Sequence, residues 1–161
     1  MVSLRTGLIC LNTTSGKETP IADAPYDTKI VRFNDGRVDP AGRFWIGTMY
    51  EPRDKPAAEM YVLDRGQLRQ AWAGGMTNSN GLAWSPDGRT MFHADTTTHR
   101  VDCYDYDVAT GVQSNGRTIK TFSTDKSAVD YGGQPDGATV DSEGAYWVAM
   151  FEGGACAALV P

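Results

Sequence analysis

One segment shows the pattern that recurs along the chain: Pro135-Asp136-Gly137-Ala138-Thr139-Val140-Asp141-Ser142-Glu143-Gly144-Ala145-Tyr146-Trp147-Val148-Ala149-Met150. It has a polar head at Asp136-Gly137, a short run that ends at Val140, a turn over 141–144 and an apolar run over 146–150. Two β-type segments joined by a short turn that contains glycine are typical of a β-hairpin. The stretch therefore predicts a strand, a tight turn and a second strand.

The same pattern occurs twice earlier in the chain, at 34–47 and at 80–95. In each copy the polar head lies eight positions before the glycine of the turn: Asn34 before Gly42, Asn80 before Gly88 and Asp136 before Gly144. A period of about 40–50 residues with four short strands per period is typical of a β-propeller. A β-sandwich with turns that are alike by chance is the alternative, but it does not predict polar heads at matched offsets. The sequence predicts an all-β fold that forms part of a β-propeller.

The repeats divide the chain of 161 residues into four units. We expect a blade remnant at 1–28, blades at 29–75 and 76–132, and a partial blade at 133–161, so that about three blades are present. A propeller must close into a ring, because open sheets leave unpaired edges. We therefore expect a missing segment or a second chain to complete the propeller.

Composition narrows the function. The net charge of −5 gives no basic surface for nucleic acid, and no apolar run approaches the roughly 18 residues that span a bilayer. We expect no secretion signal, because Met1-Val2-Ser3-Leu4-Arg5 lacks a charged region followed by an apolar one. The cysteines are few and far apart (Cys10, Cys103 and Cys156), so we expect buried, reduced thiols on strands and a cytoplasmic location.

The three heads indicate a site. The first strand of each blade lines the central channel of a propeller, so Asn34, Asn80 and Asp136 should face one another near one mouth. Two carboxamides and a carboxylate form an oxygen-only set, which suits Ca²⁺, Mg²⁺ or Mn²⁺ and less typically Zn²⁺. So few protein ligands leave room for water and substrate, as in catalytic metal sites. The alternative is that Asn-Gly and Asp-Gly only start turns or bulges.

Other chemistry-bearing residues are better explained by structure. The serines lack the Gly-x-Ser-x-Gly elbow of a nucleophile. We expect His93 to pack within a strand, His99 to lie solvated in a turn, and Glu51 to be an exposed loop carboxylate. The tryptophans expected in the core between blades are Trp45, Trp84 and Trp147.

Several segments together resemble a known family. They are Arg32-Phe33-Asn34-Asp35-Gly36-Arg37-Val38-Asp39-Pro40-Ala41-Gly42-Arg43 with Gly47-Thr48-Met49, then Asn80-Gly81-Leu82-Ala83-Trp84-Ser85-Pro86-Asp87-Gly88 with Ala94-Asp95-Thr96, Tyr104-Asp105-Tyr106-Asp107 with Thr110-Gly111, and Pro135-Asp136-Gly137. From Val31 onward the chain resembles the senescence marker protein / gluconolactonase / luciferin-regenerating enzyme family of regucalcin-like sugar lactonases. The resemblance implies a six-bladed propeller that holds one divalent cation (Ca²⁺, Zn²⁺, Mg²⁺ or Mn²⁺) at the channel mouth and hydrolyses sugar lactones.

The resemblance also implies roles for individual residues. Asn80 and Asp136 would be metal ligands, Asp136 would act as the general base for the attacking water, and Arg32 and Asn34 would contact the substrate. A strand arginine paired with a carboxylate is the other interpretation of Arg32. The family also uses a metal-binding glutamate near its N-terminus, and Glu18 is not a convincing match for it.

The sequence therefore favours metal-dependent hydrolysis of a sugar lactone by activated water. Two other functions remain open: a propeller that binds Ca²⁺ or sugar without catalysis, and a protein-interaction propeller in which the heads only form turns.

Overall fold

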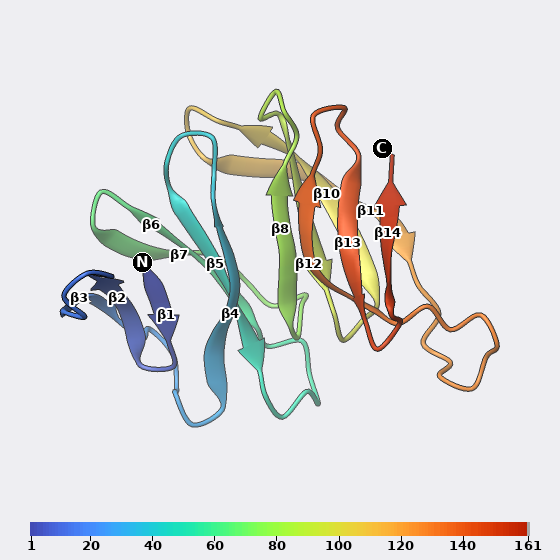
Figure 1. Ribbon diagram of the computed structural model, residues 1–161, viewed down its shortest axis with the longest axis horizontal. Coiled ribbons are helices and arrows are strands. Elements are labelled where there is room, and N and C mark those ends of the chain that lie inside the picture. Colours follow the sequence, from blue (N-terminus) through green and yellow to red (C-terminus); the bar gives the residue numbers. More distant parts are fainter. Residues whose placement is uncertain (161) are drawn as a thin grey trace.

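The computed structural model describes residues 1–160, which form β-strands joined by turns and loops and contain no helix (Figure 1). The all-β prediction is confirmed. The strands are β1 (Val2–Leu4), β2 (Gly7–Leu11), β3 (Glu18–Asp23), β4 (Val31–Val38), β5 (Phe44–Tyr50), β6 (Glu59–Asp64), β7 (Gln67–Ala73), β8 (Ser79–Trp84), β9 (Thr90–Asp95), β10 (Arg100–Asp107), β11 (Val112–Thr121), β12 (Gln134–Val140), β13 (Tyr146–Phe151) and β14 (Ala155–Leu159).

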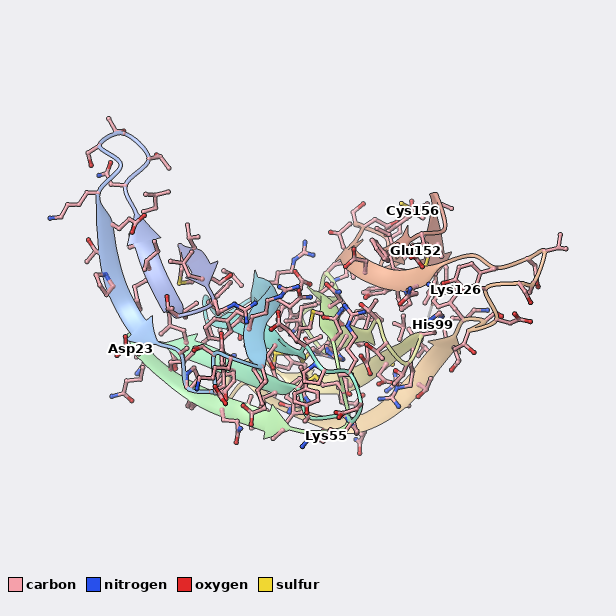
Figure 2. All side chains as sticks on the ribbon, turned by 90° about the horizontal axis from the view of Figure 1, so that it is seen from below. Asp23, Lys55, His99, Lys126, Glu152 and Cys156 are labelled. Carbon is pink, nitrogen blue, oxygen red and sulfur yellow. The ribbon has the colours of Figure 1, made fainter. Side chains whose placement is uncertain are left out.

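These strands form four antiparallel sheets in which neighbours in sequence are neighbours in space. Two sheets have four strands, β4–β7 and β8–β11, and two have three, β1–β3 and β12–β14. The first strands β4, β8 and β12 lie side by side near the middle of the molecule (Figure 1). Figure 2 shows the sheets following one another along an open arc, from the sheet that ends at Asp23 to the sheet that carries Cys156. Sheets that radiate from adjacent first strands are the blades of a β-propeller. The blade limits proposed above stay a prediction.

Aromatic side chains fill the space between the two four-stranded sheets. Trp45 is fully buried and packs against Trp72, Trp84 and Tyr106, with ring centroids 6.1, 6.3 and 6.0 Å away. Each buried ring contributes about 2–3 kcal/mol through the apolar area that it removes from water. The expectation that Trp45 and Trp84 lie in the core is therefore confirmed.

The next interface, between β8–β11 and β12–β14, is built in the same way. Phe92 stacks on Tyr146 at 5.0 Å, and Val148 and Met150 pack into the same cluster. The expectation for Trp147 is wrong, because its side chain is 44% exposed. Successive residues of a strand point to opposite faces, so burial of Tyr146 and Val148 directs Trp147 away from the neighbouring sheet.

A buried ion pair fixes the turn between β4 and β5. The Asp39 carboxylate accepts hydrogen bonds from Arg43 Nε at 2.6 Å, from Trp45 Nε1 at 3.1 Å and from the Tyr106 hydroxyl, which belongs to the neighbouring sheet. Burial by itself would raise the pKa of Asp39, but the hydrogen bonds from Tyr106 and Arg43 outweigh it and hold the pKa below its usual range. This cluster joins the sheet β4–β7 to the sheet β8–β11 next to the turn between β4 and β5.

Two further expectations about side chains are wrong. Cys10 and Cys156 are exposed, since they lie on the three-stranded sheets, and only Cys103 is buried; all three are free thiols. His99 is 6% exposed, with Nδ1 2.8 Å from the Ser123 carbonyl oxygen, because the segment after β11 folds over it. Residues 1–160 hold no apolar helix of bilayer-spanning length.

Candidate active site

The polar heads sit on β-bulges. The pairing of β4 with β5 shifts register between Phe33 and Gly36, that of β8 with β9 between Asn80 and Ala83, and that of β12 with β13 between Pro135 and Ala138. Each shift coincides with a head. A bulge bends its strand and re-aims a side chain. The idea that Asn-Gly and Asp-Gly only start turns or bulges is thus half right: bulges are present, at equivalent places on three first strands.

The residues aimed by these bulges line one pocket of about 240 Å³, together with polar residues two positions earlier on the same strands. Alternate residues of a strand share a face, so each blade contributes a pair to the pocket. The pairs are Arg32 with Asn34, Asn78 with Asn80, and Gln134 with Asp136. All four residues singled out in the sequence are therefore brought together, while their chemical roles stay predictions.

Arg32 and Asn34 form a connected unit. Arg32 Nη1 donates to Asn34 Oδ1 at 3.0 Å, and Asn34 Nδ2 donates to the Ser79 carbonyl oxygen at 2.9 Å. The Asn34 carboxamide is thus held between two blades, with its oxygen turned to the guanidinium. This arrangement favours contact of Arg32 and Asn34 with a ligand over direct metal binding by Asn34.

Asn80 is fixed by Thr96, at the end of β9. Asn80 Nδ2 donates to Thr96 Oγ1 at 2.8 Å, and Thr96 Oγ1 donates to the Pro135 carbonyl oxygen at 2.8 Å. Both Asn80 and Thr96 are more than nine-tenths buried. Because Pro135 precedes Asp136, the Thr96 hydroxyl connects the strand of Asn80 to the strand of Asp136. The bond to Thr96 uses the nitrogen of the Asn80 carboxamide and leaves its oxygen, Oδ1, free to bind a ligand.

Asp136 is partly buried, and within residues 1–160 its carboxylate receives no hydrogen bond. A second carboxylate, Asp35, lies behind it and accepts a hydrogen bond from Leu82 N at 3.3 Å. Burial raises the pKa of Asp35, and the charge of Asp136 adds to the effect. Asp136 is therefore the carboxylate that is open to a ligand from the pocket.

Asn78 carries an unused acceptor. Its Oδ1 is buried and has no hydrogen-bond donor within the described chain, although the side chain lines the pocket. A buried acceptor without a donor costs about 1–3 kcal/mol. A water enclosed next to this oxygen would remove the cost.

The loop after β5 supplies the rim. Arg53 lines the pocket, and its Nη2 lies 3.9 Å from Met49 Sδ. Glu51 is engaged by Arg5 through two hydrogen bonds of 2.7 and 2.8 Å, which lower the pKa of Glu51. Arg32 Nε is 3.6 Å from Glu51 Oε1. Arg32 therefore has the carboxylate neighbour that the second interpretation required, but also faces the pocket.

The donor set can be tested against a divalent cation. Among the described residues, no group of three or more His, Cys, Asp or Glu side chains could hold a metal ion. The pocket instead offers the Asp136 carboxylate and carboxamide oxygens, and hard cations accept such oxygens together with water. Asn80 Oδ1 and Asp136 thus fit a hard cation as a partial ligand set.

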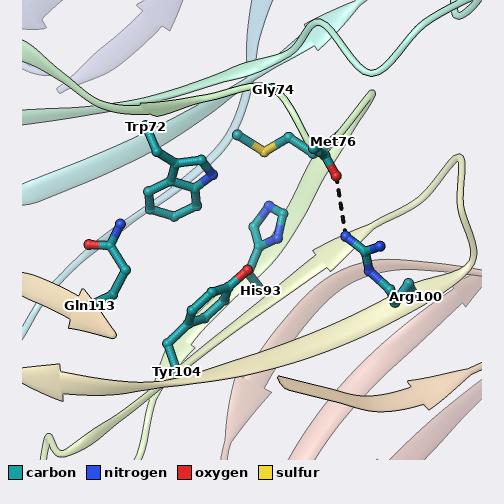
Figure 3. A pocket seen from close by; sticks show the side chains of 8 residues that line it. Trp72, Gly74, Met76, His93, Arg100, Tyr104 and Gln113 are labelled. Atoms are coloured by element: carbon teal, nitrogen blue, oxygen red, sulfur yellow. Dashed lines mark hydrogen bonds between the residues drawn. The ribbon is translucent and has the colours of Figure 1, made fainter. Parts of the chain in front are cut away.

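A separate cavity of about 200 Å³ lies between the four-stranded sheets (Figure 3). Arg100 Nη2 donates to the Gly75 carbonyl oxygen at 3.2 Å at its edge, and His93 lies at its base, next to Trp72. Burial lowers the pKa of His93 to about 4, and His93 Nε2 is 3.0 Å from Ser79 Oγ. The expectation that His93 packs within a strand is confirmed.

Several residues of the pocket were not predicted from the motifs. Asn78 and Gln134 each lie two positions before a head, as Arg32 does, so the period of two was the available signal. Met49, Thr96 and Phe151 come from the ends of second strands, and Arg53 comes from a loop. No repeat marks Arg53, because loops vary from blade to blade.

Comparison with known proteins gives matches over the whole chain. The model of the family described as "SMP-30/Gluconolactonase/LRE-like region" matches residues 1–161. A 6-deoxy-6-sulfogluconolactonase from Pseudomonas putida is 38% identical over 161 residues, which are 100% of this chain and 53% of that protein.

Solved structures give the same result. A luciferin-regenerating enzyme superposes with a TM-score of 0.82 at 33% identity, over 98% of this chain and 53% of its own. A calcium-binding protein, regucalcin, from Agrobacterium tumefaciens superposes with a TM-score of 0.79 at 30% identity, over 91% of this chain and 48% of its own. The chain thus spans about half the length of the relatives that it matches.

Proposed function

The chain belongs to the SMP-30/gluconolactonase/LRE-like family, and from that premise we propose that the protein hydrolyses sugar lactones with the help of one divalent cation. The observation that carries the proposal is the convergence of Arg32, Asn34, Asn80 and Asp136 on one pocket. The relative from Pseudomonas putida is named as a lactonase, which supports a lactone as the substrate class.

Hydrolysis of a lactone joins the oxygen of water to the carbonyl carbon and breaks the ring C–O bond, while a proton moves from the water to the ring oxygen. The Asp136 carboxylate is the base of the pocket: it takes the proton of the water as the new bond forms, and returns it to the leaving oxygen. Its freedom from hydrogen bonds within residues 1–160 leaves one oxygen for the cation and the other for this transfer.

Arg32 and Asn34 orient the sugar. The Arg32 guanidinium donates hydrogen bonds to an oxygen of the sugar away from the reacting carbonyl. Asn78 lines the pocket beside these two residues. Water exclusion is partial, since the pocket lies open at the mouth between the first strands.

Asn80 and Asp136 would hold the cation, which would supply Lewis acidity for the lactone carbonyl and lower the pKa of a neighbouring water. Thr96 keeps the carboxamide of Asn80 turned with its oxygen toward the pocket. A regucalcin relative is titled a calcium-binding protein, which supports a divalent ion without selecting Ca²⁺ over Mg²⁺, Mn²⁺ or Zn²⁺.

The test is acid release from glucono-1,5-lactone by the full-length protein, above the spontaneous rate, with and without EDTA. We expect turnover that EDTA abolishes and that added Mn²⁺ or Ca²⁺ restores. Metal binding without turnover would replace the proposal with a propeller that binds cation or sugar without catalysis. Absence of both would leave a protein-interaction propeller.

A further inference from the structure

The pocket carries more positive charge than the reaction needs. Two guanidinium groups, those of Arg32 and Arg53, line it together with one carboxylate, that of Asp136. The neighbouring carboxylate of Glu51 lies 3.6 Å from Arg32 Nε but is shared with Arg5, which donates two hydrogen bonds to it, so this single carboxylate does not balance both Arg5 and Arg32. A concave site with an excess of one charge attracts ligands of the opposite charge. A neutral lactone would leave this charge unused.

Arg53 has no carboxylate partner within the described residues, unlike several other arginines of the molecule. Arg5, Arg43, Arg100 and Arg117 each lie within hydrogen-bond distance of a carboxylate. Within residues 1–160, no carboxylate lies within 4.0 Å of the Arg53 guanidinium, whose polar contact is the Met49 sulfur. A thioether is only a weak acceptor, so the donors of Arg53 remain available to a ligand.

The two pocket arginines converge. Arg32 Nη2 lies 3.1 Å and Arg53 Nη2 3.9 Å from the same Met49 Sδ atom, so the two nitrogens are no more than about 7 Å apart. Oxygens of a single anion that each lie about 2.8 Å from a guanidinium nitrogen can span that gap. A tetrahedral oxyanion has three outer oxygens, which lets it serve both guanidinium groups at once.

The backbone holds Arg53 at the rim in an uncommon conformation. Its φ is 57°, and its N–H donates to the Tyr50 carbonyl oxygen at 3.2 Å. A residue other than glycine in the left-handed region costs about 1 kcal/mol. Arg65 has a similar φ of 49° in the exposed β6–β7 turn, outside the pocket. A positive φ therefore does not by itself indicate a role in binding. Arg65 provides a matched control, because it has the same residue type and a similar backbone conformation outside the pocket.

We propose that Arg53, acting with Arg32, binds a phosphate or sulfonate group carried by the sugar lactone, so that the site selects an anionic lactone over a neutral one. This inference rests on the proposed function and names its substrate class. The carbonyl end of the substrate lies at Asp136 and Asn80, and the anionic end lies at the rim beneath the β5–β6 loop.

Binding is measured first, without turnover. D-glucitol and D-glucitol 6-phosphate, which cannot be hydrolysed as lactones, are titrated calorimetrically into the EDTA-treated full-length protein. We expect the phosphate to bind at least about tenfold more tightly than the neutral polyol, since a charge-assisted hydrogen bond contributes about that factor or more. Arg53→Gln should remove this preference, and Arg65→Gln should keep it. The same preference in Arg53→Gln, or none in the wild type, would overturn the proposal.

Kinetics separate this inference from the function on which it rests. Arg53→Gln should lower kcat/KM about tenfold or more for glucono-1,5-lactone 6-phosphate and its 6-sulfonate counterpart, mainly through KM, and leave the neutral lactone within about twofold. Hydrolysis of all three lactones with no dependence on Arg53 would reject the subsite and keep the lactonase. A phosphate preference that depends on Arg53 without hydrolysis would keep the subsite and reject the lactonase. Comparison of the two anionic lactones assigns phosphate or sulfonate.

Discussion

Thr96→Val tests how the site is held together. The Thr96 hydroxyl accepts from Asn80 Nδ2 and donates to the Pro135 carbonyl oxygen, each at 2.8 Å. Valine has the same shape but forms neither bond, so it leaves two buried polar groups without partners. The Asn80 carboxamide then loses the contact that decides which of its ends faces the pocket.

The size of the effect follows from these contacts. Each unsatisfied buried group costs about 1–3 kcal/mol, and loss of a residue that orients a metal ligand lowers metal affinity or activity by about 10–100-fold. We therefore expect the Kd for Mn²⁺ to rise by about 10–100-fold. With two such groups, the free energy of unfolding should fall by about 2–6 kcal/mol.

The assay is calorimetric titration of Mn²⁺ into the full-length protein, combined with urea unfolding. Thr98→Val is the matched control, because Thr98 lies on the same turn and its hydroxyl bonds to the Asp95 carboxylate at 2.9 Å, outside the pocket. Thr98→Val should leave Mn²⁺ affinity within about twofold of wild type. A folded Thr96→Val protein with unchanged Mn²⁺ affinity would show that Thr96 does not orient Asn80 as a metal ligand.

Three further predictions concern stability. Asp39→Asn leaves the buried Arg43 guanidinium without its counter-ion and should lower the free energy of unfolding by about 3–5 kcal/mol at pH 7. This loss should exceed that of Asp141→Asn in the equivalent, exposed turn. It should shrink as the pH falls below about 4, because the pKa of Asp39 is lowered in the fold. The pKa of His93 is about 4 in the fold and about 6.5 in the unfolded chain, so the unfolded chain binds more protons between these pH values. The free energy of unfolding should therefore rise with pH across that window by up to about 3 kcal/mol. In urea titrations, His93→Gln should remove this pH dependence. Gly81→Ala should lower the melting temperature, since Gly81 has a φ of 61° and a Cβ there would collide with the Tyr146 hydroxyl.

The repeat of head and turn was enough to predict the sheets. Pairing of neighbouring strands depends on short strand-forming segments and on glycines in the turns between them. Both are present in residues 34–47, 80–95 and 135–150. It was also enough to bring Asn34, Asn80 and Asp136 into one pocket, because equivalent places on first strands converge whatever the side chains are. The bulges that aim these side chains follow the same dipeptides.

What a repeat cannot predict is which face of an outer sheet is covered. Trp45 and Trp147 occupy equivalent places after the turn, and both donate Nε1 to an aspartate, yet Trp45 is buried and Trp147 is 44% exposed. Their surroundings differ, since β4–β7 has a neighbour on that face. The prediction that Cys10 and Cys156 are buried was wrong for the same reason. Arg53 was not predicted, because its position depends on the path of a single loop.

Lactone hydrolysis by Asp136→Asn in the full-length, metal-loaded protein tests whether Asp136 is the base of the reaction. Asparagine keeps the shape and an oxygen ligand but cannot accept the proton of the attacking water, so kcat should fall by about 100-fold or more. Asp141→Asn, on the turn of the same sheet and outside the pocket, should keep the wild-type rate. Hydrolysis by Asp136→Asn at the wild-type rate would contradict the account.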